Sequence, residues 1–303
     1  MAINTIALAT TMTEELDRAV AQKAVTGFFA DNALRAKFVG AGTVLIPEVG
    51  VSGLGDYDRD TGFVQGAITV SNKSHTLTMD RGRSFHLDAQ DADESGIPDL
   101  AGEVSGEFVR TQVVPELDAY VLSKLAGYAV GKAQTVTGTP ASQAYKMLTG
   151  AIEKVQNAVG YEEELVCFVN STFHSAIQST DELTRQLTVG NFRKGTVDLQ
   201  VKSLNGVAIL PVNDSRMKTA YTFNDGASED QEAGGFTPTT TAKSIGFLVL
   251  PKRAGMLVKK TEKTRIFAPN ANQKADAWKI DYRIYYDLFI KNSLAAGVYA
   301  YTY

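Results

Sequence analysis

The chain contains 303 residues, of which 44% are hydrophobic and 21% are charged. This composition is typical of a globular protein with a core of normal size, and it excludes a fully disordered chain or a small disulfide-stabilised scaffold. The formal net charge of -4 gives no overall attraction to nucleic acid, which disfavours a DNA-binding protein. The one cysteine, Cys167, lies in a short apolar run, so we expect a small core residue rather than a nucleophile.

The first 37 residues predict an extended arm that carries a short helix. Thr13 can cap this helix, and Leu16, Val20 and Phe28 fall on one face of it. The first basic residue is Arg18, and no uncharged stretch reaches the length of a membrane span, so we expect no export signal and no membrane contact. The helix is polar on its other sides, and we expect it to pack on something outside its own core.

Residues 48–84 predict a long β-excursion that needs a neighbour. Five glycines lie between residues 50 and 66, and strand-like alternation follows. We interpret this segment as mostly polar, with few side chains that can bury anything. An isolated hairpin is marginally stable in water, so the segment is expected to lie on another molecule.

The rest of the chain alternates between helices and strands. A long helix is predicted over about 99–130, with a kink at Pro115, and a second over 141–158. Residues 131–140 predict a linker, a short helix begins at Ser171, and residues 224–242 predict an exposed loop. Strands are predicted at 164–169, 196–202, 206–212, 245–250, 255–260, 264–267, 278–290 and 297–303.

No segment predicts a catalytic, cofactor or metal site. The three histidines are scattered, and the acidic stretch after His86 does not match a calcium loop. The sequence at Gly131 and Lys132 lacks the first glycine and the hydroxyl residue of a phosphate loop, and no nucleophile-elbow motif is present. The sequence therefore favours a structural protein over an enzyme.

Three segments, in order along the chain, resemble the major capsid proteins of tailed bacteriophages, which have the fold named after coliphage Hong Kong 97. The most specific is LTMDRGRSFHLD at residues 77–88, followed by GEFVRTQVVPELDAY at 106–120; it resembles the end of the extended E-loop and the spine helix of that family. The second, LNGVAILPV at 204–212, is similar to a strand pair of the A-domain. The third comprises residues 265–270, 282–292 and 297–299.

The resemblance implies an α+β fold of the Hong Kong 97 type, with an arm, an E-loop hairpin, a peripheral P-domain that holds the long spine helix, and a mixed axial A-domain. It also implies self-assembly into hexamers and pentamers of an icosahedral or prolate head that encloses double-stranded DNA. The implied domain limits are 1–37 for the N-terminal arm, 48–84 for the E-loop, 38–47, 85–140 and 243–290 for the P-domain, and 141–242 and 291–303 for the A-domain.

The implied partners are copies of the chain itself, a scaffolding protein, a portal and a decoration protein. Packaged DNA is expected to make only weak, non-specific contact. Some family members carry a scaffolding segment before the arm; the arm here begins near Met1, so we expect either a separate scaffolding protein or a segment missing from this sequence. The expected location is the virion, after assembly in the host cytoplasm.

Contacts between subunits are expected at the E-loop, and two runs of charge are further candidates. Residues 88–107 contain seven acidic and no basic residues, and residues 243–265 contain seven basic residues and one acid, Glu262. We favour solvated surfaces for both runs, with a meeting of the two across subunit boundaries as the alternative. Some relatives cross-link an E-loop lysine to a neighbour's asparagine; for Lys73, an exposed lysine is favoured. The candidate contact residues are Gly53, Gly55, Tyr57, Lys73, Arg81, Arg83, Asp91, Asp93, Lys259 and Lys260.

Three alternatives remain open from the sequence. An encapsulin, a bacterial nanocompartment shell protein, shares the fold. A β-rich hydrolase without a recognisable motif would need a pocket of perturbed titratable groups. A minor tail or decoration protein would be expected to lack the match to the spine helix.

Overall fold

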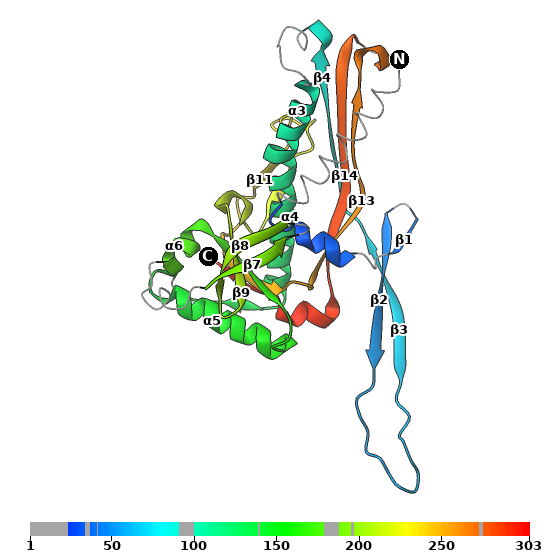
Figure 1. The fold of residues 1–303 in the computed structure, drawn as a ribbon, viewed down its shortest axis with the longest axis vertical. Helices are drawn as coiled ribbons and strands as arrows, with labels where there is room; N and C mark the ends of the chain where they lie inside the picture. Colours follow the sequence, from blue (N-terminus) through cyan, green and yellow to red (C-terminus); the bar gives the residue numbers. More distant parts are fainter. Residues whose placement is uncertain are drawn as a thin grey trace.

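The computed structural model describes residues 24–33, 37–40, 42–90, 100–138, 140–178, 188–194, 197–272 and 275–303. The molecule is elongated, and Figure 1 shows three parts. A seven-stranded sheet with its helices forms one side, a long sheet runs beside a long helix, and a narrow hairpin projects from the body. None of the helices in these residue ranges is long and apolar enough to cross a membrane.

The seven-stranded sheet is buried on both faces because its central strands are apolar throughout. Every residue of β6 (Leu165–Asn170) and β12 (Ile245–Pro251) is buried, and successive side chains enter two different cores. Helices α5 (Pro140–Val159) and α6 (Ser171–Gln178) cover one face, and α4 (Val114–Gly131) covers the other. The strand order is β5 (Thr135–Val136), β15 (Tyr299–Thr302), β12 (Ile245–Pro251), β6 (Leu165–Asn170), β9 (Val207–Val212), β8 (Val197–Leu204) and β7 (Thr188–Lys194).

The long helix predicted over 99–130 is confirmed, and it contains an irregular turn. It comprises α3 (Leu100–Phe108), a π-helical turn η2 (Val109–Val113) and α4 (Val114–Gly131). Pro115 lies just after the π turn, at the start of α4. Proline lacks an N–H group, and its ring collides with the carbonyl group one turn earlier, which is why a kink is predicted at Pro115. The wider π turn before Pro115 removes this collision.

The long sheet is antiparallel, with β14 (Ala277–Ile290) between β13 (Gly255–Phe267) and β4 (Met79–Asp88). Alternate residues of β14 pack on α4, so the long helix is enclosed between the two sheets. The two strands predicted at 255–260 and 264–267 form the single strand β13. A bulge at Lys260 shifts the register between Lys259 and Thr261 and interrupts the alternation there.

The smaller elements connect these parts. A third sheet contains β1 (Lys37–Val39), β2 (Thr43–Val51) and β3 (Ile68–Thr76), and a two-stranded ribbon contains β10 (Tyr221–Phe223) and β11 (Phe236–Pro238). The short 3-10 turns are η1 (Gly27–Ala33), η3 (Asp214–Arg216), η4 (Pro269–Ala271) and η5 (Asn292–Gly297).

The strands group differently from the predicted division of the chain. Strand β12 lies inside the stretch 243–290 that was assigned to the P-domain, but it is a central strand of the seven-stranded sheet. Its seven buried residues favour a strand covered on both faces, which the long sheet does not offer. Strand β4 crosses the predicted E-loop limit at residue 84, because all of it pairs with β14.

Candidate assembly interface

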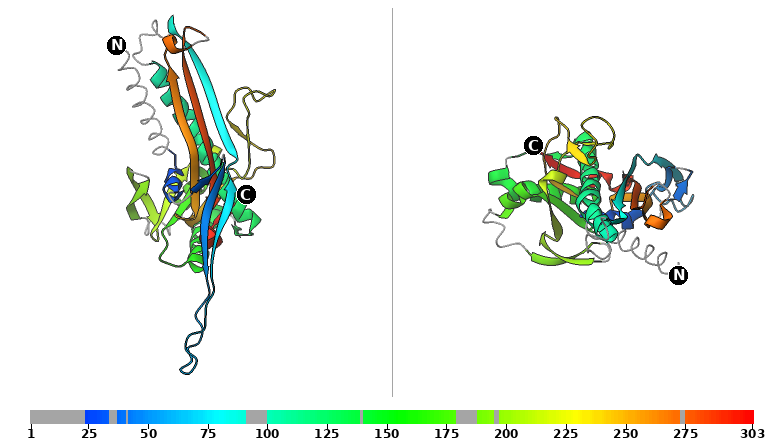
Figure 2. Two further views of the ribbon diagram at one scale, coloured as in Figure 1. Left: turned by 90° about the vertical axis from the view of Figure 1, so that its right-hand side faces the viewer. Right: turned by 90° about the horizontal axis from the view of Figure 1, so that it is seen from above.

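Strands β2 and β3 and the loop between them, residues 43–76, form a hairpin that projects away from the body (Figure 1 and the left view of Figure 2). Its base packs on the long sheet through a small buried cluster around Val44 and Phe289. Most of the large apolar side chains that are exposed in the described parts of the chain lie on this hairpin. We call them the hairpin patch: Val49, Val51, Leu54, Tyr57, Phe63, Val64, Ile68 and Val70.

The register of the two strands places their side chains on two distinct faces. One face carries two opposed pairs of branched apolar residues, Val49 with Val70 and Val51 with Ile68. The opposite face carries Val44, which is buried at the base. The expectation of a mostly polar hairpin with little to bury is therefore wrong, because one face is an exposed apolar stripe that has no covering in the described part of the chain.

The tip of the hairpin is a tight turn that displays two aromatic rings. The carboxylate of Asp58 accepts hydrogen bonds from the backbone N–H groups of Asp60 (2.6 Å) and Thr61 (3.2 Å), and these bonds lower the pKa of Asp58. The ring centroids of Tyr57 and Phe63 are 4.8 Å apart, and Phe63 is 88% exposed. An aromatic side chain this exposed on a hydrogen-bonded turn is typical of a binding element.

The structure places four predicted contact residues on the hairpin. Gly53, Gly55 and Tyr57 lie in the exposed segment beyond β2. Lys73 lies midway along β3, where it is half-exposed and forms an ion pair of 2.9 Å with Glu48 of the same chain. Contacts from these residues to another subunit remain a prediction.

A buried carboxylate fixes the base of the hairpin. Asp287 on β14 accepts hydrogen bonds from the N–H (3.1 Å) and the hydroxyl (2.9 Å) of Thr78, which lies between β3 and β4. On α4, Tyr120 donates its hydroxyl to Asp287 (2.6 Å) and Lys124 forms an ion pair with it. Burial raises the pKa of the Tyr120 hydroxyl, so it remains a donor. One side chain thus joins the hairpin, the long sheet and the long helix.

Arg81 holds a loop of the chain against the long helix. It forms a two-pronged ion pair with Glu116 on α4 (2.6 and 3.1 Å) and donates to the backbone carbonyls of Asn224 (2.7 Å) and Gly235 (3.2 Å). We call residues 224–235 the strap. Residues 224–235 of the loop predicted over 224–242 are therefore held against the body, because Arg81 links both ends of the strap to α4.

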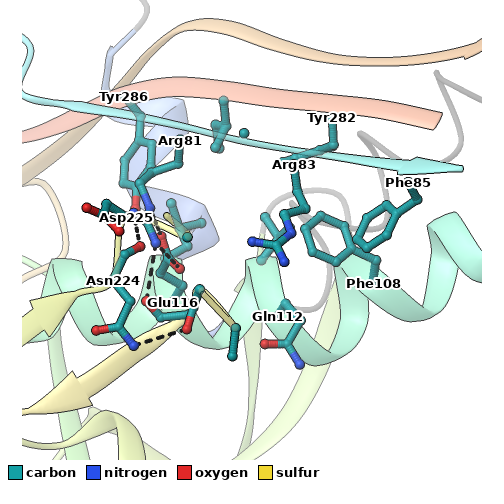
Figure 3. Close-up of a pocket in the computed structure, with 18 residues that line it drawn as sticks. Arg81, Arg83, Phe85, Phe108, Gln112, Glu116, Asn224, Asp225, Tyr282 and Tyr286 are labelled. Atoms are coloured by element: carbon teal, nitrogen blue, oxygen red, sulfur yellow. Dashed lines mark hydrogen bonds and ion pairs between the residues drawn. The ribbon is translucent and has the colours of Figure 1, made fainter. Parts of the chain in front are cut away.

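A pocket of about 370 Å³ lies between the strap, β4 and the long helix. Figure 3 shows Arg83 and Gln112 facing each other across it, with the rings of Phe85 and Phe108 beside them. The centroids of Phe85 and Phe108 are 4.8 Å apart, and Tyr282 continues the aromatic wall at 5.7 Å from Phe108. The pocket therefore combines an aromatic wall with a cationic end.

The segment DRGR, on which the family resemblance depends most, has a physical explanation within one chain. Asp80 accepts a hydrogen bond from Arg283 on β14 (2.9 Å), and Arg83 donates to the backbone carbonyl of Glu232 in the strap (3.1 and 3.2 Å). A Cβ on Gly82 would lie 2.8 Å from the carbonyl oxygen of Tyr282, so only glycine fits there. Arg81 and Arg83 thus make contacts inside the chain, and their predicted contacts between subunits are untested.

Two lysines of the basic run have partners within the same chain. Lys259 forms an ion pair of 2.7 Å with Glu262, the one acid of the run, and Lys260 donates to the carbonyl of Gly40 (3.0 Å). The one acid of the run therefore neutralises Lys259 locally. Asp91 and Asp93 lie outside the described residues, so the proposed meeting of the two charge runs stays a prediction.

No family model and no curated protein matches the sequence. Solved structures of phage capsids do match the fold. A structure from Gordonia phage Cozz is 14% identical, with a TM-score of 0.54 over 85% of this chain and 80% of that one. The bacteriophage PhiM1 mature capsid is 14% identical, with a TM-score of 0.53 over 86% and 82%. The virus-like particle from Pyrococcus furiosus is 8% identical, with a TM-score of 0.54 over 97% and 99%.

The fold is therefore that of proteins that build closed shells. More specifically, it is the mixed α+β fold of tailed-phage capsid proteins, the Hong Kong 97 type, and the predicted fold class is confirmed. Identities of 8–14% show a shared fold and no more.

Proposed function

We propose that the chain is the major capsid protein of a tailed bacteriophage. In this role it assembles into the hexamers and pentamers of an icosahedral or prolate head that encloses double-stranded DNA. A scaffolding protein and a portal are its expected partners, with a decoration protein on the outer surface. The chain acts in the virion after assembly in the host cytoplasm, and it performs no catalysis.

The hairpin patch carries this proposal. The body of the molecule has its own buried cores on both faces of the seven-stranded sheet, so the part of the hairpin beyond its base is not needed to complete the fold. The hairpin nevertheless exposes a stripe of valine and isoleucine and an aromatic tip to solvent. Soluble monomers rarely expose a contiguous apolar surface on a projecting arm, and such surfaces mark binding to another protein. The match to shell-building folds supports a neighbouring copy of this chain as that protein.

Sedimentation velocity and negative-stain microscopy of the purified chain test the proposal. We expect closed shells or capsomers at high protein concentration, either alone or after co-expression with a scaffolding protein from the same genome. A compact monomer under every protein and salt concentration, with and without the scaffold, would contradict a capsid role.

A nanocompartment shell is the second candidate function. The virus-like particle from Pyrococcus furiosus aligns over nearly the full length of both chains, and this coverage favours a shell of that kind. The contents of shells purified from the native source separate the two functions. Packaged double-stranded DNA supports the phage head, and an enclosed enzyme without DNA supports the nanocompartment.

A further inference from the structure

Residues 24–33, which we call the arm root, lie where the seven-stranded sheet and the long sheet meet (Figure 1). The rings of Phe28 and Phe29 are buried there, with centroids 6.2 and 6.1 Å from the ring of Phe168 on β6. Phe28 thus belongs to the core of the body, contrary to the expectation that its helix packs outside it. A Cβ on Gly255, the first residue of β13, would lie 2.9 Å from the ring of Phe29. The arm root therefore contacts both sheets at once.

The arm root also holds the chain where it passes from one sheet to the other. Residues 252–254 join β12 to β13, and residues 291–298 join β14 to β15. The two connections lie against each other, because the N–H of Lys291 donates to the carbonyl of Ala254 (2.9 Å). The amide of Asn32 donates to the carbonyls of Lys252 and Gly255, both at 2.8 Å, and so spans the first connection. A change in the angle between the sheets must bend the chain at these connections, since hinges lie at the ends of rigid elements.

The beginning of the arm root is held by a buried carboxylate. Asp118 on α4 accepts hydrogen bonds from the N–H of Val25 (3.1 Å) and from the N–H (3.0 Å) and the hydroxyl (2.7 Å) of Thr26. It also forms an ion pair of 3.1 Å with Arg216 on η3, the turn that follows β9 of the seven-stranded sheet. Asp118 and Thr26 are fully buried. Partial withdrawal of the arm root is therefore costly, because it leaves a buried charge with fewer donors.

We propose that the arm root is a latch that sets the angle between the seven-stranded sheet and the long sheet. In the seated state, Asn32 and the two phenylalanine rings fix the hinge formed by the two connections. In the released state, fewer contacts hold the hinge, and the angle between the sheets varies more widely. The chain before Ala24 continues directly from the latch, so a force on that part acts first on the contacts of Asp118. The inference concerns a single subunit and goes beyond the proposed shell function, on which it does not depend.

Distances between two spin labels, measured by pulsed electron paramagnetic resonance on the unassembled subunit, test the latch. Labels at Glu153→Cys on α5 and Lys263→Cys on β13 report the position of one sheet relative to the other, and both positions are exposed. The natural Cys167 is buried and burial raises the pKa of its thiol, so it stays unlabelled. The latch variant, Asn32→Ala with Thr26→Val, removes the bonds across the hinge and the hydroxyl donated to Asp118. We expect a narrow distance distribution in the natural chain and a clearly broader one in the latch variant.

The matched control carries Asn272→Ala with Thr149→Val. The amide of Asn272 donates to the carbonyl of Ala277 (2.9 Å) in the turn between β13 and β14, and the hydroxyl of Thr149 donates to the carbonyl of Tyr145 (3.0 Å) within α5. The control thus removes an asparagine and a threonine hydrogen bond without changing the hinge, and its distance distribution is expected to match that of the natural chain.

An unchanged distance distribution in the latch variant would overturn the proposal. Equal broadening in the latch variant and the control would also overturn it, because a general loosening of the fold then explains the result. If circular dichroism shows that the latch variant does not fold, Asn32→Ala alone replaces it, since Asn32 is only half-buried. All these measurements use the unassembled subunit, so their outcome is separate from whether the chain forms shells.

Discussion

Replacing one opposed pair of the hairpin patch should weaken assembly without unfolding the subunit. Val49 and Val70 face each other across the hairpin and are each 67% exposed. Burying a valine fully contributes about 1.5 kcal/mol, so covering these two side chains contributes about 1 kcal/mol each, or about 2 kcal/mol per hairpin contact. Threonine has the same shape and strand preference as valine but carries a hydroxyl group. The double variant Val49→Thr with Val70→Thr therefore removes this hydrophobic contribution to the contact.

A loss of about 2 kcal/mol corresponds to about 30-fold in the association constant of each contact. The assay is the protein concentration at which shells appear by light scattering, with the unfolding of the isolated subunit measured in parallel. The control changes two residues on the opposite, polar face of β3, with Thr69→Ala and Ser71→Ala. The reasoning would be refuted if the valine variant assembled at the natural concentration, or if both double variants shifted it equally.

Three further predictions concern the isolated subunit. Asp287→Ala leaves the donors around Asp287 without an acceptor, so it should lower the free energy of unfolding by roughly 3–5 kcal/mol in urea titrations. Asp287→Asn should lower it by less. Equal, small effects of the two variants would contradict a central role for the carboxylate. Arg81→Met should increase amide exchange across the strap and cost about 1–3 kcal/mol, and unchanged exchange would show that Arg81 does not hold the strap. Burial against Phe289 is the main cause that lowers the pKa of His75 below 6.5, so the unfolded chain binds more protons than the folded chain as the pH falls through 6.5. The free energy of unfolding should therefore decrease as the pH falls through this range. His75→Gln should reduce this dependence of stability on pH.

The helices and strands of the body could be predicted because the pattern of apolar residues within each segment indicates how that segment is buried. The apolar run around Cys167 is a fully buried strand, and the helix predicted at 141–158 is α5. The grouping of the strands could not be predicted in the same way. Strand β12 precedes β13 by a short turn, yet the two belong to different sheets, and neither periodicity nor composition distinguishes that from a hairpin.

The buried carboxylates were missed for a related reason. Asp118 is fully buried and binds the hydroxyl of Thr26 (2.7 Å) and the guanidinium of Arg216 (3.1 Å), partners that are distant in the sequence. The available signal was an acid inside an apolar run, as at Asp287 within the segment IYYDLFI. For the hairpin, the glycine-rich segment between residues 50 and 66 predicts few side chains that can be buried, whereas the register that aligns Val49 with Val70 reveals the apolar face.

Amide hydrogen exchange of residues 48–80, compared between free subunits and assembled shells, tests the docking of the hairpin most directly. The base is fixed by Asp287, but the segment beyond it projects into solvent, where β2 and β3 pair with each other. The expected result is low protection of this segment in the subunit and clearly higher protection in the shell, with little change in the seven-stranded sheet. Equal protection of the hairpin in both states would contradict its role as the element that binds a neighbouring copy.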